Sequence, residues 1–145
     1  IAAILDAAAD SWTPWTLFTV AARQWYAGNI GLIGDAAHAM VPFQAQGAAM
    51  GIEDAAVLAP LLVGQPDAEA GLARYQHLRQ PRVTRVARTS ASNGRIFHLP
   101  WPLSLARDQV IAAQGSQGHL RRLAWLYDYD ATAHSEVNPA GRPAA

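Results

Sequence analysis

The stretch GLIGDAAHAMVPFQAQGAAMGIEDAA, residues 31–56, combines an apolar run, one carboxylate, a proline turn and a series of small residues. Residues 29–34 (NIGLIG) form a short apolar segment bounded by glycine, which is typical of a buried strand in a parallel sheet. Asp35 follows that segment directly. Because ligands of open α/β folds bind at the carboxyl ends of the strands, the stretch predicts that Asp35 accepts hydrogen bonds from a polyol ligand.

Small residues mark the start of the next predicted element, a helix over residues 47–63 that follows the turn through Pro42. The first N–H groups of a helix have no intrahelical partner, so they can donate to an anionic or carbonyl group of a ligand. Positions that recur every fourth residue here are all small: Gly47, Gly51, Ala55 and Ala59. This face either packs tightly on the sheet or lets a flat ligand lie close to the backbone.

The rest of the chain is predicted to be mostly helical. Apolar spacing indicates helices at residues 1–9, 67–79, 81–92, 103–113 and 119–126, and a short strand at 17–20. Pro60 is expected to bend or break the last turn of its helix, and Pro81 to stand in the first turn of a new one. Residues 139–145 are expected to form a frayed tail.

Composition limits the class of protein. The 145 residues are 51% hydrophobic and 15% charged with a formal net charge of zero, which indicates a globular domain rather than a disordered or fibrous chain. The absence of cysteine excludes disulfides and thiolate metal sites. No apolar run approaches the roughly 20 residues of a membrane span, and the first residues lack the charged, apolar and small-residue order of a signal peptide. We therefore expect a cytoplasmic protein without a membrane partner, and the initial Ile1 leaves open a longer parent chain.

Several motifs together resemble one enzyme family. GDAAH at 34–38, Pro42, the pair Gln46-Gly47 and EDA at 53–55 closely resemble the second FAD-binding motif of single-component aromatic-ring flavoprotein monooxygenases. This group includes para-hydroxybenzoate and salicylate hydroxylases. RQPR at 79–82, NGR at 93–95 and WLY at 125–127 resemble the helix, turn and tail that follow that motif in salicylate and 3-hydroxybenzoate hydroxylase-like members.

The resemblance implies a fold class and a division of the chain. The class is α/β, namely the C-terminal part of a Rossmann-type FAD-binding monooxygenase fold with one parallel-sheet strand in this chain. Residues 1–28 would end the substrate-binding domain, residues 29–92 would form the C-terminal part of the FAD-binding domain, and residues 93–145 would form a C-terminal helical tail.

The same resemblance implies roles for individual residues. Asp35 would accept hydrogen bonds from ribityl or ribose-side hydroxyls of FAD, and Gly34 would let the backbone approach the cofactor. The residues implied to border the isoalloxazine ring are Pro42, Gln46, Gly47 and Ala48. Pro42 would also line the active site where the substrate meets the flavin. His38 is predicted to stabilise the turn rather than to act in catalysis, and no metal site is predicted.

The reaction implied by the resemblance consumes NADH or NADPH and dioxygen. FAD would form a C4a-hydroperoxyflavin that hydroxylates a phenolic or aromatic acid substrate in a dry pocket, and the aromatic side chains of Trp12, Trp15 and Phe43 are compatible with such a pocket. The chain has no GxGxxG turn to hold the FAD pyrophosphate. We therefore expect a separate N-terminal portion to supply that turn, and this chain alone to be incomplete and inactive.

Two other functions stay open. The chain could be a catalytically inactive fragment that acts only as a structural or interaction module. It could also bind nucleic acid through arginines that gather in one region: Arg74, Arg79, Arg82, Arg85, Arg88 and Arg95. Since the net charge is zero and no recognition motif accompanies these arginines, the sequence favours a solvated helix face with ion pairs and no nucleic-acid partner.

Overall fold

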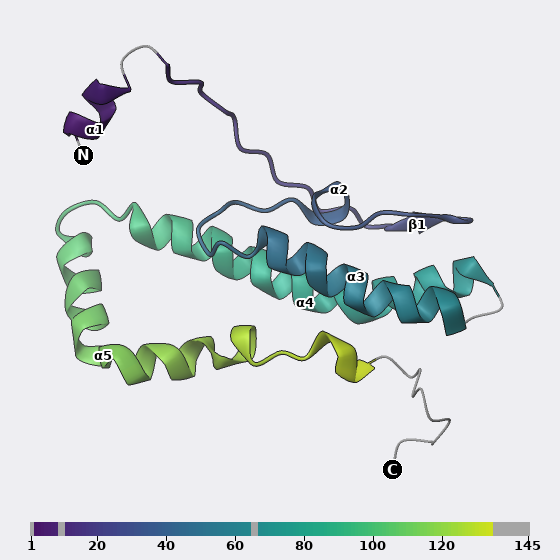
Figure 1. Cartoon of the computed structure of the whole chain (residues 1–145). Coiled ribbons are helices and arrows are strands. Elements are labelled where there is room, and N and C mark those ends of the chain that lie inside the picture. Colours follow the sequence, from purple (N-terminus) through teal and green to yellow (C-terminus); the bar gives the residue numbers. More distant parts are fainter. Residues whose placement is uncertain (1, 9–10, 65–66, 135–145) are drawn as a thin grey trace.

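The computed structural model describes residues 2–8, 11–64 and 67–134, which form a mainly helical arrangement with one small hairpin (Figure 1). In chain order the elements are α1 (Ala2–Ala7), β1 (Tyr26–Ala27), β2 (Ile30–Gly31), α2 (Asp35–His38), α3 (Gly47–Gly64), α4 (Ala68–Phe97), α5 (Leu103–Tyr127) and the 3-10 helix η1 (Ala131–His134). Helices α3 and α4 lie side by side, and the extended segment after α1 leads to the hairpin.

The core lies mainly between α3 and α4. One face of α4 is buried because apolar residues recur there at three- to four-residue spacing, among them Leu72, Tyr75, Val83 and Val86. From α3 and its surroundings, the core receives Trp25, Met50, Val57 and Leu61. Asp67 caps the start of α4, since its side chain accepts a hydrogen bond from the Glu69 N–H at 3.1 Å. Helices α3 and α4 thus form the packed core against which the hairpin and the segment at residues 34–46 lie.

Two predictions concern prolines inside helices. The sequence predicts separate helices that meet at Pro81, but α4 is one helix from Ala68 to Phe97. Pro81 is exposed, so the carbonyl that loses its N–H donor can be hydrated, while the buried Arg79 and Val83 keep the same face of the helix on α3. Likewise, Pro60 does not break α3, which continues to Gly64.

Part of the strand predicted at residues 29–34 is present as β2, its residues are exposed rather than buried, and its place in a parallel sheet stays a prediction. Within the described ranges the sheet consists of β1 and β2 alone, and they pair antiparallel with Tyr26 opposite Gly31. The reason is the short turn between them, where Gly28 adopts a φ of 54° that suits a tight hairpin. A parallel neighbour would require a crossover of a dozen or more residues. Instead, the Leu32 N–H donates to the Trp25 carbonyl at 2.7 Å and extends the hairpin toward the 34–38 segment.

Other expectations fare differently. Residues 17–20 do not form a strand, and their side chains are exposed. The two predicted helices at 103–113 and 119–126 appear as one element, α5, which is interrupted at Gly115 with φ 61° and ψ 173°. A helix near the start is confirmed as α1, whereas the tail at 139–145 lies outside the described residues. Across the described residues, each helix is too short or too polar to cross a membrane.

Candidate functional site

A hollow of about 570 Å³ lies between the turn at residues 34–35 and the start of α3. Its lining residues come from three nearby segments: Gly34, Asp35, Met40, Pro42, Ala45, Gly47, Ala48 and Gly51. The structure therefore brings together five of the six predicted site residues. The sixth, Gln46, is buried, and its carbonyl accepts the Met50 N–H at 2.9 Å, so it begins α3 without lining the hollow.

The turn at Gly34 gives the hollow its shape. Gly34 has φ 55° and ψ −139°, a backbone conformation that residues with a side chain rarely adopt. Its carbonyl accepts hydrogen bonds from the N–H groups of Ala37 and His38, each at 3.0 Å. This geometry leaves the Asp35 side chain at the exposed start of α2. The backbone also approaches α3 closely, because a Cβ on Gly51 would lie 3.8 Å from the Gly34 Cα.

The sequence left two interpretations of the small-residue face of α3, tight packing and close approach of a ligand, and different positions support each. Gly51 packs against the backbone of the turn, as tight packing predicts. Gly47 faces the hollow instead, since a Cβ added there would lie 4.0 Å from Oδ1 of Asp35. Ala55 and Ala59 are exposed. The backbone of α3 beside the carboxylate is therefore bare in the first turn and at Gly51, which also lines the hollow.

A buried carboxylate, Asp54, holds the turn at residues 34–38 by hydrogen bonds. Its Oδ2 accepts the Gly34 N–H at 3.0 Å and lies 2.6 Å from Nε2 of His38, while its Oδ1 accepts Nε of Arg79 at 2.9 Å. Burial alone would raise the pKa of Asp54, but the hydrogen bonds from His38, Arg79 and Gly34 outweigh burial and lower it. Asp54 is therefore a fixed negative charge, and His38 holds the turn, as the sequence predicts.

The ion pairs continue outward from Asp54. Nη1 of Arg79 donates to Glu53 at 2.7 Å, and Arg82 donates to both Glu53 oxygens, each at 2.7 Å. Burial works to lower the pKa of Arg79, but the carboxylates of Asp54 and Glu53 raise it overall. Arg82 also donates to the Leu126 carbonyl at 3.0 Å, so the cluster joins α3 and α4 to the end of α5.

The sequence pattern predicts that these arginines lie on a solvated face, and for Arg79 that prediction is wrong. Its side chain is 0% exposed, and that of Arg82 is 9% exposed. The sequence does contain a pattern that could have indicated these ion pairs. Glu53 and Asp54 are adjacent on one helix, and Arg79 and Arg82 lie three residues apart on the next, so they share one face of that helix. Sequence spacing alone did not show that the two faces lie together.

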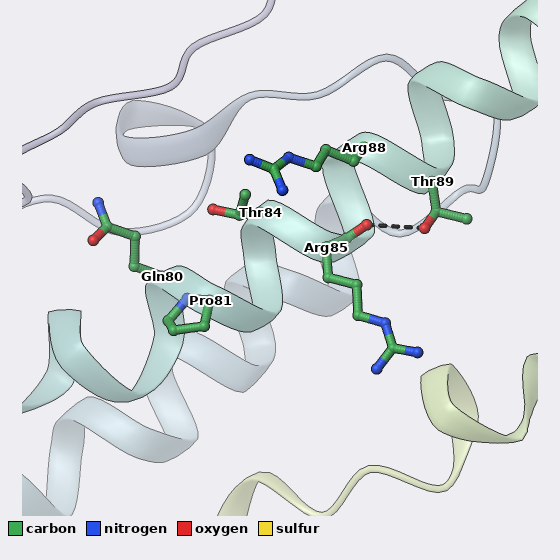
Figure 2. A pocket seen from close by; sticks show the side chains of 6 residues that line it. All are labelled: Gln80, Pro81, Thr84, Arg85, Arg88 and Thr89. Atoms are coloured by element: carbon green, nitrogen blue, oxygen red, sulfur yellow. Dashed lines mark hydrogen bonds between the residues drawn. The ribbon is translucent and has the colours of Figure 1, made fainter.

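Two further arginines behave as surface residues. Figure 2 shows a shallow depression on α4 in which the Arg85 side chain points toward the α5 side and the Arg88 side chain extends along another direction. The guanidinium of Arg85 lies 4.0 Å from the centre of the Trp125 ring, a cation–π contact. Because the two side chains diverge, this depression does not focus both charges on one ligand.

The aromatic residues expected around a dry pocket are not gathered here. Trp12 and Trp15 are 57% and 83% exposed. The Phe43 ring packs edge-on against Phe97 and His98, and it occupies the space where a Cβ on Gly94 would lie. Among the residues that the structure describes, no group of three or more His, Cys, Asp or Glu side chains could hold a metal ion.

Comparisons with known proteins agree on one family. The FAD binding domain family matches residues 2–90. The chain is 44% identical to a 3-amino-4-hydroxybenzoate 2-monooxygenase of Streptomyces platensis over 88% of this chain and 32% of that protein. It is 40% identical to a salicylate hydroxylase of Pseudomonas putida over 81% of this chain and 27% of that protein.

A solved structure agrees with these relatives. The fold resembles a salicylate hydroxylase substrate complex with a TM-score of 0.62 and 31% identity, over 85% of this chain and 29% of that one. The chain thus spans about a third, or less, of the length of the proteins it matches. Since the family match covers more than half of its residues, the chain belongs to the FAD binding domain family and resembles the FAD-dependent aromatic hydroxylases.

Proposed function

We propose that this chain is part of a flavoprotein monooxygenase that uses NAD(P)H and dioxygen to hydroxylate a phenolic or aromatic acid substrate in the cytoplasm. The observation that carries the proposal is the exposed Asp35 carboxylate beside the bare first turn of α3, in one hollow. The family match and the names of the relatives support the cofactor and the class of reaction.

The residues of the hollow fit a bound FAD. Asp35 can accept hydrogen bonds from sugar or ribityl hydroxyls, and Gly34 leaves room for them because it has no side chain. The first N–H groups of α3, near Gly47 and Ala48, have no partner within the helix, so they suit the polar edge of the flavin ring. Pro42 lines the same hollow and is the residue we assign to the boundary with the substrate.

The chemistry divides between the cofactor and the chain. FAD, when bound, supplies the electron transfer that lets NAD(P)H and dioxygen hydroxylate an aromatic ring. The chain contributes binding and orientation through Asp35, and a favourable helix dipole through the start of α3. Gln46 is assigned a supporting role, since it is buried and its carbonyl anchors the first turn.

A second portion is required by this proposal. The sequence has no GxGxxG turn, which in Rossmann-type folds places the pyrophosphate at a helix N-terminus. We propose that an N-terminal portion supplies it, and we call the complete protein with that portion the assembled flavoprotein. The chain alone is then expected to bind FAD weakly and to be inactive.

Replacing Asp35 tests the proposed function. A charged acceptor that loses its hydrogen bonds costs about 1.5–3 kcal/mol, so Asp35→Ala should weaken FAD binding roughly 10- to 150-fold in the assembled flavoprotein. The measurement is a titration of flavin fluorescence, with the melting temperature beside it. Asp128→Ala is the matched control, because Asp128 is also exposed but lies at the end of α5. An unchanged dissociation constant for Asp35→Ala would show that Asp35 is no cofactor ligand.

One observation favours the second candidate, an inactive structural or interaction module. Several large apolar side chains are strongly exposed, including Trp15 at 83%, Phe18 at 74% and Trp101 at 77%. Such surface favours burial against another protein surface. Co-purification with the N-terminal portion separates the two: a yellow complex supports the monooxygenase, whereas a colourless complex that takes up no added FAD supports the module.

A further inference from the structure

We propose that Asp54 is a positioning residue, whose carboxylate fixes the turn at residues 34–38 and thereby aims Asp35 into the hollow. This inference rests on the proposed role of Asp35 in binding FAD. Asp54 itself is 0% exposed and does not line the hollow, so it acts on the cofactor only through the turn.

One oxygen atom holds both ends of the turn. Oδ2 of Asp54 accepts the N–H of Gly34, the residue immediately before Asp35, and it also pairs with Nε2 of His38, the last residue of α2. The residues between these two anchors are Asp35 to Ala37. Because Gly34 is held in a left-handed conformation, the bond to its N–H fixes the backbone that orients the Asp35 side chain.

His38 depends on the same carboxylate. Nδ1 of its ring is buried and has no hydrogen-bond partner among the described residues. The ring is therefore oriented by its bond to Asp54 and by its contact with the Trp25 ring, whose centre lies 5.1 Å away. If Asp54 moved, both anchors of the turn would be released together.

Arg79 keeps the carboxylate in place. It donates to Oδ1 of Asp54 from the opposite side, so the two oxygens serve different partners and the group cannot rotate without breaking a charge-assisted bond. A buried carboxylate needs such a partner, because an unpaired charge in the interior is very costly. The turn is thus tied through Asp54 to the middle of α4.

The neighbouring carboxylate offers a matched control. Glu53 pairs with Arg79 and Arg82 in the same cluster, yet its hydrogen bonds run to those arginines rather than to the turn. If Asp54 were purely structural, replacing Asp54 or Glu53 would weaken FAD binding equally for an equal loss of protein stability. A positioning role predicts that Asp54 affects FAD binding far more.

The test compares Asp54→Asn with Glu53→Gln in the assembled flavoprotein. In Asp54→Asn, an NH₂ group replaces one carboxylate oxygen and faces a hydrogen-bond donor, either Nε of Arg79 or the N–H of Gly34. Two donors cannot bond to each other, so the hydrogen bond to one of them is lost. We expect Asp54→Asn to raise the FAD dissociation constant by about tenfold or more and to change the visible circular dichroism of bound flavin. Glu53→Gln should alter both by less than about threefold, although it also lowers the melting temperature.

The outcomes separate this inference from the proposed function. If Asp35→Ala leaves FAD binding unchanged, the proposed function fails. If Asp35→Ala weakens binding but Asp54→Asn and Glu53→Gln have equal effects, the function stands and the positioning role is overturned. Should Asp54→Asn fail to fold, amide exchange in the unaltered apoprotein decides: a protected Gly34 N–H supports the bond to Asp54, and rapid exchange at Gly34 refutes it.

Discussion

Replacing Arg79 by methionine measures how strongly the buried ion cluster stabilises the protein. Arg79 is 0% exposed and donates to Asp54 at 2.9 Å and to Glu53 at 2.7 Å. In the variant, Glu53 keeps Arg82, but Asp54 loses the Arg79 guanidinium and keeps only the Gly34 N–H and the His38 ring among the partners described above. Removing one partner of a buried ion pair costs about 3–5 kcal/mol, which is roughly a 150- to 4,000-fold change in the unfolding equilibrium.

The assay is urea unfolding followed by far-UV circular dichroism. Arg85→Met is the control on the same helix, because Arg85 is exposed and contributes mainly its contact with the Trp125 ring, about 0.5–1 kcal/mol. A double variant, Arg79→Met with Asp54→Leu, should lose less stability than Arg79→Met alone, since no buried charge is left unpaired. Equal midpoints for Arg79→Met and Arg85→Met would refute the buried cluster.

Two other predictions concern acid stability and the flavin. The pKa of Asp54 is lowered in the folded state, so its stabilisation is complete above the unfolded value of about 3.9 and is lost as the pH falls through the folded pKa. Urea midpoints measured from pH 6 downward should therefore fall less steeply for Asp54→Asn than for the unaltered protein. A valine at Gly47 would fill the space beside Asp35 and displace the flavin from the start of α3. Gly47→Val should lower the FAD midpoint potential by roughly 20–40 mV in a redox titration, whereas lost stability at constant potential would indicate packing alone.

Periodicity predicted the helices well where the signal is local. The helix over residues 47–63 is confirmed as α3, and the interruption near Gly115 separates the two segments of α5 as expected. The error among the helices came from Pro81, which was expected to begin a new helix and lies inside α4. A proline removes one hydrogen bond, but Pro60 and Pro81 lie in helices whose neighbouring residues are buried against each other, and that packing outweighs the loss.

The strand was harder to predict because a strand takes its direction from its partner. The apolar pattern at residues 29–34 is compatible with parallel and antiparallel pairing alike. In the structure, Gly28 turns the chain back, so that Ile30 pairs with Ala27 within a hairpin. Local sequence indicated the extended segment, whereas the tight turn determined what it paired with.

The candidate site divides in the same way. Residues 34 to 51 are close in sequence, and the hollow they line follows from one continuous motif. The support beneath it depends on Asp54 and Arg79, which lie 25 residues apart on two helices and meet only when α3 packs on α4. No periodicity within either helix could show that meeting.

The site and the core are therefore linked by charge rather than by apolar contact alone. From the exposed Asp35, the connection passes through the Gly34 N–H to Asp54, then to Arg79 and Glu53. The three hydrogen bonds along this connection are 2.7–3.0 Å long, and Asp54 and Arg79 are fully buried. A neutral residue at position 54 could occupy the same volume, but it could not hold a glycine N–H on one side and a guanidinium on the other. The charge at Asp54 thus gives the turn at residues 34–38 a defined orientation, which a carboxylate must have if it is to select cofactor hydroxyls.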